Sequence, residues 1–277
     1  MNFVPAISKT SPYYQRWLTG LLLGLPVAAC VIAGPSWSWW IIVTAISALA
    51  TWELHGLLFN ESLPLKWRVL SFAAAVLMPA GAQFAGLAGL NLALFCSVFG
   101  AFCLILLTSP RDPEEISRMA RMALAWFYVP FLISYVLLLG AEPTGRFCIL
   151  FVLGTIIAGD AGAYHTGIKF GRHKLFEQVS PKKTVEGAVG GLAASMVVGT
   201  VLGLLFLRNL EFRNVLAFSF FVAITGQIGD LVESMIKRNC GKKDSSGLLP
   251  GHGGFLDRLD SLLFAFPLMW FLLRWVA

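Results

Sequence analysis

Residues 187–207 read GAVGGLAASMVVGTVLGLLFL and contain no charged side chain. A helix needs about 20 consecutive apolar residues to cross the hydrocarbon core of a bilayer, so this stretch predicts a transmembrane helix. The whole chain has the same character, with 57% hydrophobic residues, 13% charged residues and a mean hydropathy of +0.74. Soluble domains average roughly 25% charged residues, so the composition indicates a polytopic membrane protein.

Length and interruption by charge divide the chain into about nine expected transmembrane helices of an all-α membrane protein. They are expected at 17–33, 36–58, 68–88, 89–108, 119–140, 146–165, 187–207, 213–236 and 259–276. Only the segment Gly86–Gly89 suggests a turn between the third and the fourth. Because the loops are short, residues 1–277 are expected to form a single membrane domain, with N-terminal helices in 1–145 and the charged motifs in 146–277.

Lysine and arginine are distributed unevenly over the expected loops. With the N-terminus inside, 17 of them lie on the cytoplasmic side and 4 on the other side. The positive-inside rule therefore favours an N-in, C-out topology. The two long charged loops, 169–183 and 237–258, then face the cytoplasm, where nucleoside triphosphates are found.

The segment 234–260, SMIKRNCGKKDSSGLLPGHGGFLDRLD, concentrates charge in an otherwise apolar chain. Charged side chains beside a bilayer are costly, so their concentration here indicates a chemical role. Carboxylates offer hard oxygen ligands to Mg²⁺ and basic side chains bind phosphates, a combination that suits phosphoryl or nucleotidyl transfer. The carboxylates are those of Asp244, Asp257 and Asp260, and the cations are those of Lys237, Arg238, Lys242, Lys243 and Arg258.

The spacing within this segment supports the same interpretation. Asp257 and Asp260 are three residues apart, so on a helix they share one face and can approach a common cation. Arg258 offers a two-pronged donor to a phosphate. The pair Gly253–Gly254 lets the backbone approach an anion closely, and His252 can donate a hydrogen bond or act as an acid or base.

Each of these residues also has a purely structural interpretation. Carboxylates at a helix start can complement the helix dipole, and lysines at a membrane face can bind lipid headgroups without specificity. Asp230 and Glu233, again on one helical face, can join the cation site or pair with the neighbouring Lys237 or Arg238. Taken together, the spacings favour one site over many separate structural roles.

A second cluster precedes the span 187–207. Asp160 ends the preceding span, and Lys182, Lys183 and Thr184 follow in the loop, where they can contact a triphosphate. Thr184 or Glu186 can instead cap the next helix. The cluster therefore has both a functional and a structural interpretation.

Other features of the chain limit the possibilities. The small residues Gly187, Gly190, Gly191 and Gly199 predict close helix packing. Glu53, a carboxylate within a span, can pair with His55 or with another helix and receives no role. The five cysteines form no Cys-x-x-Cys pair, so any metal should be oxygen-ligated. No basic stripe with interleaved aromatic residues suggests nucleic-acid binding.

These motifs closely resemble those of the phosphatidate cytidylyltransferase family, also called CDP-diacylglycerol synthases. The family pattern Ser-x-x-Lys-Arg-x4-Lys-Asp-x5-Pro-Gly-His-Gly-Gly-x2-Asp-Arg-x-Asp runs here from Ser234 to Asp260. The segments 160–164, 180–187 and 229–234 match as well. The resemblance covers 160–261, and the family often has Ser or Thr in place of Ala161 and an aromatic residue in place of Val185.

The resemblance implies transfer of CMP from CTP to phosphatidate, which gives CDP-diacylglycerol and pyrophosphate. It implies Mg²⁺, with or without a second cation, held by Asp230, Asp257 and Asp260. Catalytic roles fall to Lys243, Asp244, His252 and Arg258, and substrate binding to Lys182, Lys183, Thr184, Lys237, Arg238, Gly253 and Gly254. The expected location is a bacterial-type inner membrane with the site facing the cytoplasm, and a homodimer is compatible with the family.

Two other functions remain open from the sequence. A CTP-dependent polyprenol or phytol kinase would use similar metal chemistry, but it would transfer the γ-phosphoryl group to an alcohol and release CDP. A non-catalytic lipid transporter or scaffold would turn over no nucleotide at all. The products formed from CTP therefore separate all three.

Overall fold

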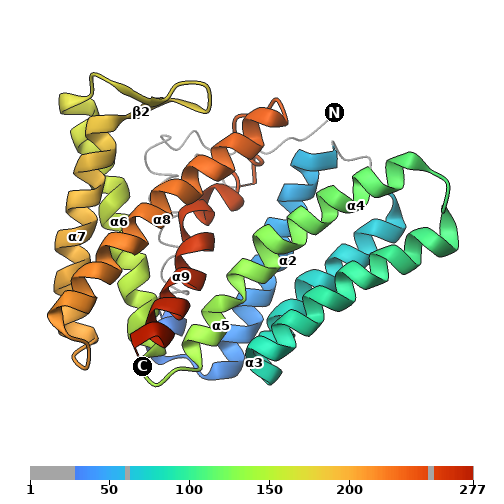
Figure 1. Cartoon of the computed structure of the whole chain (residues 1–277), viewed down its shortest axis with the longest axis horizontal. Helices are drawn as coiled ribbons and strands as arrows, with labels where there is room; N and C mark the ends of the chain where they lie inside the picture. Colours follow the sequence, from blue (N-terminus) through green and yellow to red (C-terminus); the bar gives the residue numbers. More distant parts are fainter. Residues whose placement is uncertain (1–28, 60–62, 249–252, 277) are drawn as a thin grey trace, which may run out of the picture.

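The computed structural model describes residues 29–59, 63–248 and 253–276, and in these ranges the chain is a bundle of helices with one short β-hairpin (Figure 1). The elements are α2 (Ser36–Phe59), α3 (Leu65–Thr108), α4 (Pro113–Trp126), the π-helix η1 (Phe127–Phe131), α5 (Tyr135–Gly140), α6 (Gly145–Phe170), β1 (Lys174–Phe176), β2 (Ser180–Thr184), α7 (Val185–Phe206), α8 (Phe212–Asn239), the 3₁₀ turn η2 (Leu256–Arg258) and α9 (Asp260–Val276). The all-α prediction is confirmed except for the antiparallel pair β1–β2, which the hydropathy pattern does not predict because both strands lie in a polar loop.

Six helical stretches in the described ranges are long and apolar enough to cross a membrane. They are α2, α3, the stretch Pro113–Gly140, α6, α7 and α8. The protein is therefore an integral membrane protein built from helices. The last expected span is occupied by α9, which has 17 residues. The first expected span, 17–33, lies mostly outside the described residues, so the number of nine helices stays a prediction.

The long element α3 is a hairpin of two helices. Gly86 has φ 61° and ψ −148°, a backbone conformation that glycine adopts far more readily than other residues, and the helix breaks there. Lys66 Nζ at one end donates a hydrogen bond to Thr108 Oγ1 at the other end, at 2.9 Å. The predicted turn is thus confirmed, and it separates the third expected span from the fourth.

Small residues bring α6 and α7 together. A Cβ atom on Gly191 would lie 2.8 Å from the carbonyl oxygen of Gly159, and one on Gly187 would lie 3.0 Å from that of Ala163. Side chains larger than hydrogen would force the two backbones apart. The close packing predicted from these glycines is confirmed, and it fixes the positions from which α6 and α7 reach the polar end of the bundle.

The two long charged loops meet at one end of the bundle, in the upper part of Figure 1. The β-hairpin joins α6 to α7, and Arg238 at the end of α8 donates to the carbonyl of Val179 in this hairpin at 3.2 Å. Lys242, just after α8, donates to the carbonyl of Gly56 near the end of α2 at 2.7 Å. The polar segments of both halves of the chain are therefore joined here.

The packing of α6 on α7 predicts a difference between two glycine substitutions. Gly191→Ala should destabilise the protein by about 1–3 kcal/mol, because the new methyl group overpacks the contact. Gly100→Ala is the matched control, since the nearest atom to its Cβ would be at 3.7 Å and alanine favours helix. Thermal unfolding of the two purified variants in detergent measures this difference, and equal midpoints would contradict the close approach.

Candidate active site

A cavity of about 760 Å³ lies between α6, β2, α7, α8 and the start of α9. Its walls combine acidic and basic side chains from segments that are far apart in the sequence. The predicted site residues that line it are Lys182, Lys183, Thr184, Asp230, Lys237, Asp244, Asp257, Arg258 and Asp260. Asp160 and Tyr164 line it as well. The fold therefore gathers both charged clusters of the sequence into one site.

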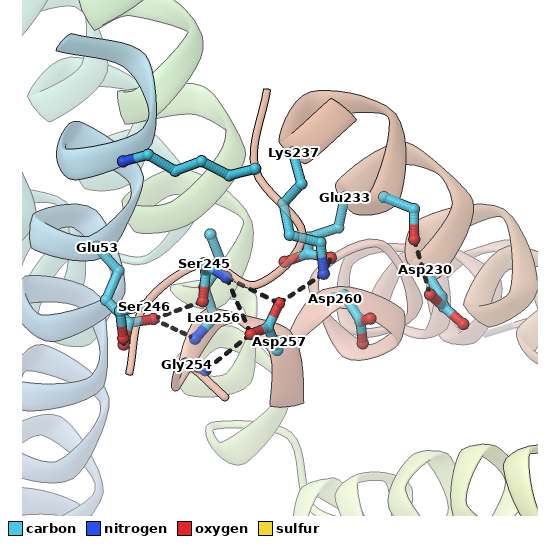
Figure 2. A network of polar contacts seen from close by, with 12 residues as sticks. Glu53, Asp230, Glu233, Lys237, Ser245, Ser246, Gly254, Leu256, Asp257 and Asp260 are labelled. Carbon is cyan, nitrogen blue, oxygen red and sulfur yellow. Dashed lines mark hydrogen bonds and ion pairs between the residues drawn. The ribbon is translucent and has the colours of Figure 1, made fainter. Parts of the chain in front are cut away.

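Asp257 is held firmly at the edge of this cavity (Figure 2). Lys237 Nζ lies 2.5 Å from its Oδ1, and the backbone N–H groups of Ser245 and Gly254 donate to its Oδ2 at 3.0 and 2.7 Å. Burial alone would raise the pKa of Asp257, but the hydrogen bonds that Lys237 and the two backbone N–H groups donate to its carboxylate outweigh this effect and lower the pKa to about 2. Asp257 is therefore a fixed carboxylate at neutral pH.

Two lysines balance the carboxylates around the cavity. Lys237 forms an ion pair with the buried Glu233 as well as with Asp257. Lys183, which comes from β2, lies 2.5 Å from Asp230 Oδ2 on α8. The pairing of Glu233 with Lys237 that the spacing allowed is thus present, whereas Asp230 is paired with a residue of the distant β-hairpin. This second pair fastens the hairpin to α8.

The carboxylates at the cavity have the chemistry that a hard cation requires. Asp160, Asp230 and Asp260 lie close enough for their negative charges to interact, and carboxylate oxygens are the ligands that Mg²⁺ prefers. Within the described part of the chain, however, no three Asp, Glu, His or Cys side chains already surround a point at which a metal would bind. The donor types fit Mg²⁺, and Lys183 and Lys237 now neutralise two of the carboxylates.

Comparison with known proteins assigns the family. The model of the cytidylyltransferase family matches residues 14–276. The chain belongs to the cytidylyltransferase family. The phosphatidate cytidylyltransferase of Bacillus subtilis is 32% identical over 264 residues, which cover 94% of this chain and 97% of that protein. That of Thermotoga maritima is 38% identical over 61% of this chain and 64% of its own length, and that of Staphylococcus saprophyticus is 43% identical over 50% and 53%.

Some predicted residues of this cytidylyltransferase lie beside the cavity and do not line it. Arg238 donates to the carbonyls of Val179 and Lys242, each at 3.2 Å, so it joins the β-hairpin to the loop after α8. Lys243 is exposed and is not among the lining residues. His252 lies outside the described residues. The roles predicted for these three side chains stay predictions.

Gly253 and Gly254 support Asp257 through their backbone. Gly253 has φ +81°, and a Cβ atom there would lie 2.8 Å from Asp257 Oδ2. Gly254 donates its N–H to the same oxygen. These contacts therefore fix the position of the Asp257 carboxylate. The sequence shows the two glycines but not this role.

Thr184 has the structural role that the sequence left open. Its Oγ1 accepts a hydrogen bond from the N–H of Gly187 at 3.1 Å, so it caps the first turn of α7. Glu186 lies in the first turn of α7, and its carboxylate accepts hydrogen bonds from the N–H groups of Arg172 and His173, just before β1. Thr184 also lines the cavity. Capping α7 is therefore compatible with its predicted contact with a substrate.

Glu53 also lies close to the site, and the sequence did not reveal its partners. It lies on α2, far from the motifs in sequence, and is 2% exposed. Its carboxylate accepts hydrogen bonds from the loop that holds Asp257 (Figure 2). It does not pair with His55, whose Nε2 lies 2.9 Å from Ser71 Oγ. Its position within an apolar span was the signal, but the partner is known only from the fold.

The backbone of the loop predicts a contrast between two alanine variants. Gly253→Ala introduces a strained φ and pushes against Asp257, so it should lower cytidylyltransferase turnover by about 10- to 100-fold, as small displacements at a reacting centre do. Gly247→Ala lies in the same loop with no atom within 4 Å of its new Cβ, so it should keep its activity. Initial rates of the two purified variants measure the contrast, and equal rates would count against the placement of Asp257.

Proposed function

We propose that the protein is a CTP:phosphatidate cytidylyltransferase, which transfers CMP from CTP to phosphatidate and yields CDP-diacylglycerol and pyrophosphate. The observation that carries this proposal is the single cavity in which both charged motifs meet. The near full-length similarity to the phosphatidate cytidylyltransferase of Bacillus subtilis supports the choice of substrates. The location of the cavity at the polar end of the bundle suits a soluble nucleotide that meets a membrane lipid.

The basic residues of the cavity are suited to bind the triphosphate. Lys182 and Lys183 approach from the β-hairpin, while Lys237 and Arg258 approach from α8 and η2. Cations on two sides of the cavity can neutralise a triphosphate and also fix its orientation. A single basic patch would bind it less specifically. In this proposal Lys183 and Lys237 turn from their carboxylate partners toward phosphate oxygens when CTP enters.

The acidic residues are proposed to hold Mg²⁺, with or without a second cation. Asp230, Asp257 and Asp260 are the assigned ligands, and Asp244 lies on the same cavity wall. Mg²⁺ bound there would reduce the negative charge that the two anionic substrates bring together. The interacting charges of Asp160, Asp230 and Asp260 support this assignment, because a cation relieves their mutual repulsion.

The proposed reaction is a displacement at the α-phosphorus of CTP. An oxygen of the phosphatidate phosphate forms the new bond to this phosphorus, and the bond to the oxygen that bridges the α- and β-phosphates breaks, so pyrophosphate leaves. The attacking oxygen is already ionised near neutral pH, so no general base is required. The protein must therefore hold CTP and phosphatidate in line. Its basic side chains would bind their phosphates, and its carboxylates would bind the Mg²⁺ that accompanies them.

We further propose nine transmembrane helices with an N-in, C-out topology in a bacterial inner membrane. Arg146 donates to the carbonyls of Ile32 and Gly34, and Arg274 pairs with Glu142, so two of the four basic residues of the expected outer face bind groups near the start of α6. The charged loops lie at the opposite end, which favours a cytoplasmic site. The proposal of a homodimer rests on the family resemblance alone.

The topology predicts which surface positions a membrane-impermeant thiol reagent reaches. In a background that lacks the five native cysteines, Asn209→Cys should be labelled in intact cells, because its loop would face outward. Gly247→Cys should be labelled only in inverted vesicles or after permeabilisation. The reverse pattern would contradict the proposed orientation.

The activity itself is tested with protein purified in detergent and supplied with CTP, phosphatidate and Mg²⁺. We expect pyrophosphate and CDP-diacylglycerol in equal amounts, with loss of both in Asp257→Asn. Glu211→Gln, an exposed residue that pairs with Arg213, is the control for neutralising a carboxylate and should keep full activity. CDP formed from a lipid alcohol would identify a kinase instead, and no turnover with any lipid would favour a transporter or scaffold.

A further inference from the structure

Glu53 is a buried carboxylate that binds the catalytic loop from the opposite half of the chain. Its Oε1 accepts hydrogen bonds from Ser246 Oγ at 2.5 Å and from the N–H of Phe255 at 2.9 Å. Its Oε2 accepts from Ser245 Oγ at 3.1 Å and from the N–H of Leu256 at 2.7 Å. These donors come from two segments between α8 and α9, 245–246 and 255–256, so one side chain of α2 ties the two segments together.

The donors that bind Glu53 are next to those that bind Asp257. Ser245 donates its hydroxyl to Glu53 and its N–H to Asp257. Gly254 donates its N–H to Asp257, and a Cβ atom on it would lie 2.8 Å from Glu53 Oε2. Figure 2 shows Ser245, Gly254 and Leu256 between the two carboxylates. A shift of the loop away from Glu53 would therefore also move the donors that fix Asp257.

Cavities lie beside the described parts of this loop. The cavity of about 760 Å³ has Asp244 and Asp257 in its wall. A second cavity of about 730 Å³ is lined by Ser245, Ser246 and Glu53. Leu256 is fully buried in the core, whereas the two serines face the second cavity, so their position depends on the hydrogen bonds to Glu53.

We propose that Glu53 is a positioning residue for the active site, which holds the segments 245–246 and 255–256 so that Asp257 keeps its place at the cavity. This inference rests on the proposed function. Glu53 lies outside the motifs and does not line the nucleotide cavity, so it acts through Asp257. Through this role α2, one of the N-terminal helices, would contribute to the active site. In the sequence, only hydropathy and length supported the resemblance for these helices.

A glutamine at this position cannot replace the carboxylate. Each oxygen of Glu53 accepts from one hydroxyl and one backbone N–H group. The amide of glutamine offers one acceptor oxygen and one NH₂ donor, so one of the two N–H groups would face another donor and remain unsatisfied. The hydroxyl of a serine can rotate to adapt, but a backbone N–H cannot. Glu53→Gln therefore loosens the loop while it preserves the size of the side chain.

Glu115→Gln is the matched control. Glu115 is 3% exposed and also accepts several bonds, from Trp67 Nε1, Lys66 and Arg118. All its partners belong to α3 and α4 in the N-terminal half, and none belongs to the catalytic loop. Glu115→Gln therefore measures how much the removal of a buried carboxylate lowers the stability of the helix bundle, without a change at the loop.

Two measurements test the proposal. Hydrogen–deuterium exchange of residues 243–258, in purified protein without metal or substrate, should be faster in Glu53→Gln than in the wild type and unchanged in Glu115→Gln. Initial rates as a function of Mg²⁺ concentration should show that Glu53→Gln needs more Mg²⁺ for half-maximal activity. The rate of CDP-diacylglycerol formation should fall by about 10- to 100-fold, as it does when residues that orient metal ligands are replaced. Glu115→Gln should lower the thermal midpoint without a change in Mg²⁺ dependence.

The exchange measurement requires no turnover, so it separates this inference from the proposed function. If the wild type forms no CDP-diacylglycerol, the proposed function is wrong, and loop exchange still reports whether Glu53 fixes the loop. If the wild type is active, unchanged exchange in Glu53→Gln, or a loss of rate equal to that in Glu115→Gln at constant Mg²⁺ dependence, overturns the proposal. Should Glu53→Gln fail to fold, Ser246→Ala removes one of the four bonds and should give the same changes to a smaller degree.

Discussion

The ion pair between Lys237 and Asp257 joins the parts of the molecule on which the site depends. Charges enclosed in a bundle of apolar helices are costly unless each finds a partner and its remaining hydrogen-bonding positions are filled. Asp257 meets this requirement with Lys237 of α8 and with two backbone N–H groups of the loop before η2. Lys237 in turn neutralises the buried Glu233. The pair therefore connects α8 and the loop with η2, which leads into α9.

The rest of the bundle brings other charged groups to the same place. Glycines let α6 and α7 approach closely, and the β-hairpin between them reaches over the end of α8. Lys183 thereby meets Asp230, although the two residues are 47 positions apart in the sequence. The cavity that results is lined by both acidic and basic residues, which suits an anionic nucleotide accompanied by a cation.

The N-terminal helices contribute more than a hydrophobic scaffold. Glu53 on α2 and Lys242 after α8 make reciprocal contacts, since Glu53 accepts from the loop while Lys242 donates to the carbonyl of Gly56. These contacts join a half of the chain without recognisable motifs to the half that carries them. Residues in such a position affect the chemistry through geometry rather than through direct contact with a substrate.

The sequence by itself determined the helical membrane class, the break at Gly86, the small-residue packing of α6 on α7 and most of the charged residues that line the cavity. These features depend on local patterns, because hydropathy, glycine and the spacing of charges act over a few turns of helix. Only the tertiary structure decided that Asp230 pairs with Lys183, that Arg238 joins two loops and that Glu53 accepts hydrogen bonds from the residues that flank Asp257. Helical periodicity shows which face a side chain occupies, but its partner depends on how distant helices pack, and that arrangement is not encoded in any short segment.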